Sequence, residues 1–330
     1  GTAASPYKLG TAAQLAWFAD TVNSGSRSAC AVLTADIDLN GQEWTPIANS
    51  GVNNGYTGTF DGQGHVIHGI CVTTGVSSRP QGLFGIIART GTVRNVKAAG
   101  RVLVRQSSGA GLIAGENNGV LYNCEASAFL KNSYNAGSTG SSVGNIGGIA
   151  GQNAATGVIR SCETAGAVFG QNMTGGLVGC NLGAVVSSKN RAYVNVESSD
   201  PTIDLDDLSL EFSLDLSKLS QLDTVSVSTD TGGVAGYSSG AISECVNEAA
   251  VGYQHIGYNV GGIAGRSSGQ IRSCTNQGAV CGRKDVGGIA GQMEPYVRTE
   301  VSSGQFARLQ SQLSELNTLV EKAVSDAEYG

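Results

Sequence analysis

The sequence is poor in the residue types that many functional sites need. Only 14% of its 330 residues are charged, 6% are aromatic and three are histidine. The net charge of −6 argues against nucleic acid as a partner, because phosphate binding needs a basic surface. The sequence has no C-x-x-C pair, and His65, His68 and His255 do not cluster with the cysteine column. Neither a metal site nor a cofactor is therefore expected. No apolar run approaches the roughly 18 residues of a membrane span, so no membrane insertion is expected.

Glycine, by contrast, is abundant and follows a repeat. The chain has 49 glycines, and the pattern G-G-[ILV]-[AV]-G occurs five times, closing at positions 151, 179, 236, 265 and 291. Looser copies end at Gly85 and Gly115. Successive closing glycines lie 26 to 36 residues apart, except for an interval of 57 residues before Gly236. A period in this range is typical of a solenoid, whose units bury apolar surface only against their neighbours.

Each repeat is predicted to contain short strands joined by tight turns. Runs of Val, Ile and Ala between clusters of Gly, Asn and Ser predict three strands per unit and no helix, which favours a parallel β-helix. Gly-x-x-x-Gly segments such as 265–269 are expected to form left-handed corners. The third residue of these segments is short and polar, which predicts a stacked, hydrogen-bonded ladder. Its members are Asn117, Asn153, Asn181, Ser238 and Ser267.

A second column consists mostly of cysteines. The residue five positions after each turn glycine is small and is expected to be buried; this structural ladder comprises Cys124, Cys162, Ser188, Cys245 and Cys274. A position that accepts either Cys or Ser suits a free thiol, which packs as a modest hydrophobe. Neighbouring rungs would lie about 4.8 Å apart, within the reach of a disulfide. Free thiols are therefore favoured, without excluding oxidation.

Both ends of the chain and one internal stretch depart from the repeat, which is assigned to residues 1–296. Thr11-x-x-Gln14 is a capping box that predicts a helix over about 11–23, covering the first rung. Residues 198–229 are acidic, with alternating leucines, and predict a hairpin insert. Residues 303–330 follow a heptad spacing and predict a C-terminal amphipathic helix. That helix is expected either to self-associate as a coiled coil or to cap the last rung.

The repeats resemble a known family. The unit G-G-[IL]-[AV]-G-x-N-x-G-x-[IV]-x-x-C, together with the segments 33–40, 44–47 and 58–67, resembles the GLUG motif of bacterial surface proteins over about residues 7–296. The resemblance implies a right-handed parallel β-helix exported to the bacterial cell surface. Similar repeats accompany some secreted immunoglobulin-A-cleaving metallopeptidases. Their zinc motif H-E-x-x-H is absent here, so the resemblance does not imply that activity.

The expected function is non-catalytic surface display or adhesion. The module would be a stiff extracellular support that binds a glycan or a host surface protein. Aromatic residues on turns can stack on sugar rings or insert into a protein partner. The candidate binding residues are Tyr237, Tyr253, His255, Tyr258 and Arg266. Plain packing of these side chains is the alternative interpretation, and a spacer without a ligand is the corresponding alternative function.

A lyase or hydrolase acting on polysaccharide is the remaining alternative. Glu125 and Glu163 follow successive ladder cysteines and could lie one rung apart, as two catalytic carboxylates might require. Lys189 at the next equivalent position favours a solvated charged row instead. Asp61 and His65 could act as a base and its orienting partner, although a role for Asp61 in capping its own glycine turn is favoured.

Overall fold

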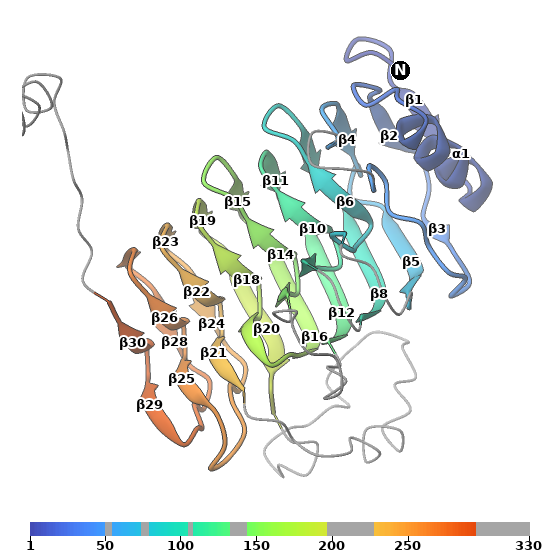
Figure 1. The fold of residues 1–330 in the computed structure, drawn as a ribbon. Coiled ribbons are helices and arrows are strands. Elements are labelled where there is room, and N and C mark those ends of the chain that lie inside the picture. The colour runs from blue at the N-terminus through green and yellow to red at the C-terminus, as the bar shows by residue number, and fades with distance from the viewer. Residues whose placement is uncertain (50–54, 74–78, 105–107, 133–143, 197–227, 295–330) are drawn as a thin grey trace, which may run out of the picture. The chain divides into compact units, whose positions relative to one another are not determined.

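The protein is a solenoid of parallel β-strands with one helix at its N-terminal end (Figure 1). The computed structural model describes residues 1–49, 55–73, 79–104, 108–132, 144–196 and 228–294. Residues 1–294 form one compact unit. The strand pairings of this unit are parallel, and each interior strand pairs with its equivalents on the rungs before and after it. The predicted all-β solenoid with an N-terminal helix is confirmed.

The strands form four sheets, here called A to D. Sheet A contains β1 (Tyr7–Leu9), β2 (Ala31–Leu33), β4 (Thr59–Asp61), β7 (Thr92–Arg94), β11 (Val120–Tyr122), β15 (Val158–Arg160), β19 (Ala184–Val186), β23 (Ala241–Ser243) and β27 (Gln270–Arg272). Sheet B contains β3 (Ile37–Asp38), β5 (Val66–Val72), β8 (Lys97–Val104), β12 (Glu125–Asn132), β16 (Glu163–Phe169), β20 (Lys189–Val194), β24 (Val246–Asn247) and β28 (Thr275–Asn276).

The other two sheets contain the strands on either side of the glycine motif. Sheet C contains β6 (Phe84–Ile87), β10 (Ala114–Asn117), β14 (Ala150–Asn153), β18 (Val178–Asn181), β22 (Ala235–Ser238), β26 (Ala264–Ser267) and β30 (Ala290–Met293). Sheet D contains β9 (Gly109–Ala110), β13 (Asn145–Gly147), β17 (Asn172–Gly175), β21 (Thr229–Gly232), β25 (Tyr258–Gly261) and β29 (Lys284–Gly287). A complete coil therefore has four strands, in the order D, C, A, B. The prediction of three is wrong.

The glycine motif folds a strand of sheet D tightly against a strand of sheet C. In Gly232-Gly233-Val234-Ala235-Gly236, β21 ends at the first glycine and β22 begins at the alanine. A Cβ atom on Gly232 would lie 1.9 Å from the Ala235 carbonyl oxygen, and one on Gly236 would lie 2.3 Å from the backbone of Met173 on the preceding D strand. A Cβ on Gly233 would lie 2.2 Å from the Gly262 oxygen on the next rung. All three positions require glycine because the backbones approach too closely for a side chain.

The repeat glycines do not form left-handed corners, contrary to expectation. Neither Gly265 nor Gly269 is among the residues with positive φ. The left-handed residue of the A-to-B corner is instead a polar residue, such as Asn123 at φ 52° or Ser273 at φ 52°. Asparagine tolerates this conformation better than most side chains. The corner breaks the strand alternation, so that Ile271 and Cys274 both pack against the core, as expected for these two residues.

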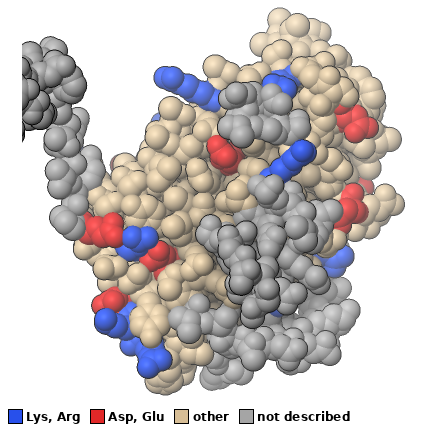
Figure 2. Space-filling view, in the orientation of Figure 1, with Lys and Arg blue, Asp and Glu red and all other residues tan. Residues whose placement is uncertain are grey.

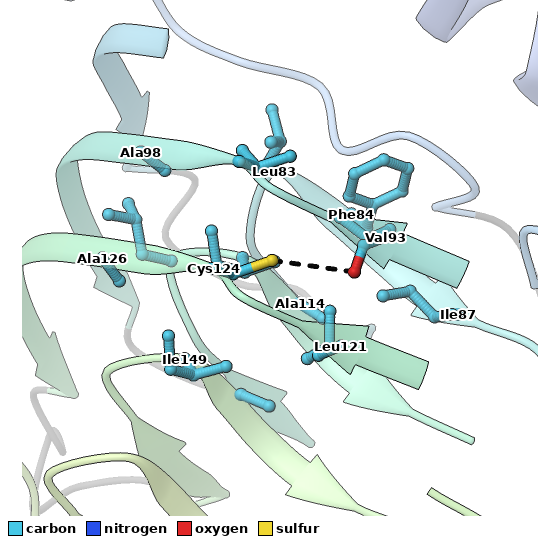
Figure 3. Packing of buried hydrophobic residues seen from close by; sticks show 14 of the residues in the cluster. Leu83, Phe84, Ile87, Val93, Ala98, Ala114, Leu121, Cys124, Ala126 and Ile149 are labelled. Atoms are coloured by element: carbon cyan, nitrogen blue, oxygen red, sulfur yellow. Dashed lines mark hydrogen bonds between the residues drawn. The ribbon is translucent and has the colours of Figure 1, made fainter. Parts of the chain in front are cut away.

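The interior is a stack of mostly aliphatic side chains, which in the first coils includes buried Tyr56, Phe60 and Phe84. Figure 3 shows Cys124 surrounded by Leu83, Val93, Leu121 and other apolar side chains, with its Sγ 3.6 Å from the Val93 carbonyl oxygen. At the N-terminal end, α1 (Ala12–Asn23) covers the first rung with Leu15, Phe18, Ala19 and Val22, which are all buried. Thr11 is its N-cap and accepts a hydrogen bond from the Gln14 N–H, as the capping box predicts.

The predicted polar ladder is confirmed from Asn117 to Ser238, whereas Ser267 does not extend it, because its buried Oγ has no hydrogen-bond partner. Asn117 Nδ2 donates to Asn153 Oδ1 at 2.8 Å, and Asn153 Nδ2 donates to Asn181 Oδ1 at 2.8 Å. Asn181 continues the chain to Ser238 Oγ at 3.0 Å. A second ladder was not predicted. Its members each lie two residues after a member of the cysteine column. It links Thr164, Asn190, Asn247 and Asn276. Each buried amide is thereby satisfied by its equivalent on the next rung.

Two predicted segments lie outside the described residues. These are the C-terminal helix over 303–330 and most of the acidic hairpin over 198–229, so both stay predictions. Thr229 does not belong to the insert, because β21 begins there. Among the described residues, no helix has the length and apolar character needed to cross a membrane.

Replacing Asn153 with alanine is expected to destabilise the solenoid. The change removes both inter-rung bonds. Asn117 Nδ2 keeps the Gly119 and Val158 carbonyls as acceptors, whereas buried Asn181 Oδ1 loses its Asn153 donor, at a cost of about 1–3 kcal/mol for the unpaired group. Gln152→Ala on the half-buried outward side of the same strand is the matched control and should cost less than about 1 kcal/mol. Urea unfolding of the two variants measures the difference. Equal losses would show that the ladder is not a major source of stability.

Candidate functional site

The chain varies most in length at one corner of the coil, where it passes from sheet B to sheet D. From β13 onward, the D-to-C connection is always two residues, as at 148–149 and 233–234. The B-to-D connection, by contrast, ranges from residues 170–171 between β16 and β17 to residues 195–228 between β20 and β21. Insertions confined to one face of a repeat protein commonly mark its binding face.

An aromatic cluster lies at the ends of the sheet B strands that lead into this corner. Phe129 and Phe169 have ring centroids 5.8 Å apart, and Tyr193 and Tyr253 pack against the same group. Phe129, Ala167 and Tyr193 are in register on β12, β16 and β20. Their neighbours Leu130, Val168 and Val194 point into the core and are fully buried, so the cluster belongs to the outer side of the sheet.

The predicted aromatic turn forms the B-to-D connection between β24 and β25. Gly252, His255 and Gly257 have φ values of 89°, 60° and 95°, so the chain turns sharply around an exposed His255. Tyr253 is half-buried and packs against the aromatic cluster, while Tyr258 begins β25. The turn therefore presents His255 to solvent beside a surface of aromatic rings.

Tyr237 and Arg266 form a second, separate group. They are in register on β22 and β26, in the column that follows the closing glycines. Arg266 Cζ lies 4.6 Å from the centre of the Tyr237 ring, and Tyr237 Oη shares a hydrogen bond with Ser268 Oγ at 3.0 Å. The five predicted binding residues thus divide into Tyr253 and His255 at the aromatic turn, Tyr237 and Arg266 on sheet C, and Tyr258 on sheet D.

Arg266 is already engaged within the protein. Its Nε and Nη2 donate to both carboxylate oxygens of Asp230 at 3.0 to 3.2 Å, and its Nη1 donates to Glu294 Oε1 at 2.7 Å. Asp230 also accepts from Asn259 Nδ2 at 2.7 Å. Hydrogen bonds to Asp230 are the main reason why the pKa of Arg266 is raised above its ordinary value. This network ties sheets C and D together and leaves Arg266 little capacity for a ligand.

The carboxylates considered for catalysis form a row of ion pairs. Glu125, Glu163 and Lys189 are in register on consecutive rungs of sheet B. Glu125 pairs with Lys97 at 3.2 Å, and Lys189 pairs with Glu248 at 2.9 Å. Glu163 pairs with Arg191. The two glutamates are therefore neutralised by partners along the sheet, which favours the solvated charged row over an acid–base pair.

Asp61 and His65 have different partners, so the structure does not join them as a base and its orienter. His65 Nδ1 lies 3.1 Å from Asp36 Oδ1. Asp61 is buried and accepts from Arg94 Nε at 2.8 Å, from Asn95 Nδ2 at 3.0 Å and from the Gln63 N–H at 3.0 Å. Burial alone would raise the pKa of Asp61, but these hydrogen bonds outweigh it and hold the pKa below its usual range. Among the described residues, no three His, Cys, Asp or Glu side chains gather as a metal site.

The ladder residues lie on the rungs that the sequence placed them on. Cys124, Cys162, Ser188 and Cys245 are buried, Cys274 is half-buried, and all eight cysteines of the chain are free thiols in the structure. Each ladder thiol donates to the carbonyl two residues earlier, as Cys162 does to Arg160 at 3.3 Å. The sequence analysis missed Phe129, Phe169 and Tyr193 as site residues. Phe129 had a detectable signal, because it is apolar at an outward position between inward Ala128 and Leu130.

No model of a known protein family matches the chain. The chain is 28% identical over 205 residues to Halomucin from Haloquadratum walsbyi, an alignment that covers 59% of this chain and 2% of that protein. It is 31% identical over 128 residues to a "putative Gly-rich membrane protein" from Evansella cellulosilytica, covering 37% of this chain and 14% of that protein. The chain therefore spans only a small part of these curated relatives.

A solved structure has a similar fold. The crystal structure of a "putative immunoglobulin A1 protease" from Bacteroides ovatus superposes with a TM-score of 0.53 over 92% of this chain and 81% of that one. The two sequences are 21% identical, so the likeness supports the fold alone. The chain is thus a parallel β-solenoid that matches short parts of two longer proteins in sequence and a Bacteroides protein in its fold.

The buried Asp61 is expected to make stability depend on pH in a defined way. Because its pKa is lower in the folded state than the ordinary value of about 3.9, its contribution is fully present above pH 4 and is lost as pH falls through the folded-state pKa. Asp61→Asn should therefore be less stable than the parent at pH 7, with the difference shrinking below pH 4. Exposed Asp20→Asn serves as the control. Chemical unfolding at several pH values measures this, and a difference independent of pH would contradict it.

Proposed function

We propose that this chain is a non-catalytic display and adhesion module of an exported bacterial protein, which binds a glycan or a host surface protein at the B-to-D corner. The aromatic cluster beside the exposed turn at residues 253–255 carries the proposal, because this is where the coil varies most in length and where rings gather on its outer side. Aromatic rings with adjoining polar groups suit both sugar stacking and protein hot spots.

The rest of the solenoid supports a role in presentation. Its inner positions are filled by aliphatic stacking and amide ladders, which leave the corner free to vary without disturbing the rungs. The paired charges of Glu125 and Glu163 favour binding over polysaccharide cleavage. We also propose an extracellular, cell-surface location, with which the names of the matched relatives agree. Membership of the GLUG-motif group is proposed on the repeat pattern alone.

Two further elements of the proposal rest on the sequence. The heptad residues of 303–330 are proposed to mediate self-association. This is refuted if deletion of that segment leaves the number of subunits per assembly in solution unchanged. Neither nucleic acid nor membrane insertion is part of the proposed function. A spacer without a ligand is the alternative that a failed binding test would favour.

The binding site is tested by alanine substitutions at the aromatic turn. The intact module is screened against immobilised microbial and host glycans and extracellular-matrix proteins, and the affinity for each reproducible partner is then measured. Tyr253→Ala and His255→Ala are expected to weaken binding by at least about tenfold, which corresponds to about 1.4 kcal/mol. Tyr122→Ala is the control, since Tyr122 is a tyrosine on the outer face of sheet A that is exposed by 43% and is therefore more accessible than the half-buried Tyr253.

The outcomes separate the alternatives. Loss of binding in the turn variants but not in Tyr122→Ala supports the corner as the site. Equal affinity in all variants places binding elsewhere and refutes the site, and a screen without any partner refutes adhesion. Release of soluble sugar fragments by the parent protein would favour the polysaccharide-degrading enzyme instead.

A further inference from the structure

The cysteine ladder contains two pairs of thiols on adjacent rungs, separated by Ser188. Cys124 and Cys162 form one pair, and Cys245 and Cys274 form the other. The second pair is in register, because Ser243 and Val246 on one rung face Arg272 and Thr275 on the next. The Thr275 N–H donates to the Cys245 carbonyl at 2.9 Å, which fixes the alignment.

The two pairs share their backbone setting but differ in access. Cys124 and Cys162 are 0% and 1% exposed, on strands with a described neighbour on both sides. Cys245 is also fully buried, whereas Cys274 is partly exposed. Cys274 lies between β27 and β28, which are the last strands of sheets A and B among the described residues. Only the second pair therefore has a sulfur that a solute can reach.

The electrostatic surroundings of the two pairs also differ. A hydrogen bond with the Cys245 thiol is the main cause that lowers the pKa of Cys274 to about 7. The same hydrogen bond, followed by burial, raises the pKa of Cys245. Burial likewise raises the pKa of Cys162 well above its ordinary value. The attacking form of a cysteine is the thiolate, so near neutral pH Cys274 is the reactive member of the ladder.

The spacing of the second pair suits a disulfide. Neighbouring strands lie about 4.8 Å apart, inside the range of about 4.4–6.8 Å for the Cα atoms of a disulfide. Side chains that point the same way must still turn their sulfur atoms toward each other and draw the Cβ atoms slightly closer. The segment around Cys274 can make this adjustment more easily than an interior segment, because β27 and β28 on either side of it each have a described neighbouring strand on one side only.

We propose that Cys245 and Cys274 are an oxidation site, at which a small disulfide such as oxidised glutathione closes a covalent link between two rungs while Cys124 and Cys162 remain thiols. The Cys274 thiolate attacks oxidised glutathione, forming a mixed disulfide and releasing one glutathione. Cys245 then attacks the Cys274 sulfur and passes its proton to the departing glutathione sulfur, which releases the second glutathione. Two protein thiols are oxidised and one glutathione disulfide is reduced to two thiols, so the step balances.

Peptide mapping of the intact chain tests this inference. The folded protein is treated with oxidised glutathione at pH 7.5, quenched with an alkylating reagent in denaturant, and digested without reduction. The expected product links the peptides that contain Cys245 and Cys274, and Cys124 and Cys162 are recovered alkylated. Cys281→Ser should still give the link, which removes ambiguity from the second half-buried cysteine on the same tryptic peptide as Cys274.

Substitutions within the ladder provide the controls. Serine is a native ladder residue at position 188, so Cys245→Ser and Cys162→Ser are mild changes. Cys245→Ser should stop at glutathione attached to Cys274, whereas Cys162→Ser should form the Cys245–Cys274 link as the parent does. Recovery of Cys245 and Cys274 as alkylated thiols in the parent overturns the proposal. So does an equal yield of a Cys124–Cys162 link, because solvent access would then not select the pair.

Discussion

The close approach of each sheet D strand to its sheet C neighbour sets the geometry of the whole coil. Backbone atoms of the two strands come so near that a single methyl group at Gly232 or Gly236 would overlap the main chain. The motif therefore acts as a two-residue turn that cannot lengthen, and it recurs in each coil from β13 onward. Strand pairing on both sides of this turn keeps the motif in register, as Gly232 with Gly261 and Ala235 with Ala264, so the motif also fixes which residues of sheets D and C stack from rung to rung.

Stacking then determines what each column can contain. Inward columns repeat the same aliphatic, thiol or amide group, and a buried amide is tolerated because the next rung supplies its partner. Side chains in outward columns do not need an identical partner on the next rung. They form ion pairs on sheet B and the Arg266 network on sheet C. The B-to-D corner is the place where chain length changes most, from residues 170–171 in one coil to residues 195–228 in the next, so it is the natural place for a binding function.

Much of the fold could be predicted because a repeat presents the same evidence many times. The column of Asn117, Asn153 and Asn181 and the capping helix with Phe18 were accessible from spacing alone. The number of strands per coil was not, because the G-G-[ILV]-[AV]-G motif looks like one strand in sequence and only backbone contacts reveal the turn inside it. The left-handed corner was assigned to glycine for a similar reason. Sequence shows where glycine occurs, but not whether it is needed for its dihedral angles or for lack of a side chain.

The candidate site was harder to predict than the fold. Tyr253 and His255 stood out as an aromatic turn, but Phe129, Phe169 and Tyr193 come from separate rungs, and only strand register brings them together. Conversely, Arg266 looked like an outward binding residue, and its bidentate bond to Asp230, 36 residues earlier, could not be foreseen from the local pattern.

The requirement for glycine at the turn is the central claim, and two equivalent glycines allow a direct test. A Cβ on Gly233 would lie 2.2 Å from the Gly262 oxygen, whereas one on Gly288 at the same motif position has nothing within 4 Å. Thermal and chemical unfolding of Gly233→Ala and Gly288→Ala should therefore differ. We expect a loss of at least about 1–3 kcal/mol for Gly233→Ala, as for other overpacked sites, and a change within about 0.5 kcal/mol for Gly288→Ala. Equal effects, or a fully stable Gly233→Ala protein, would contradict the account.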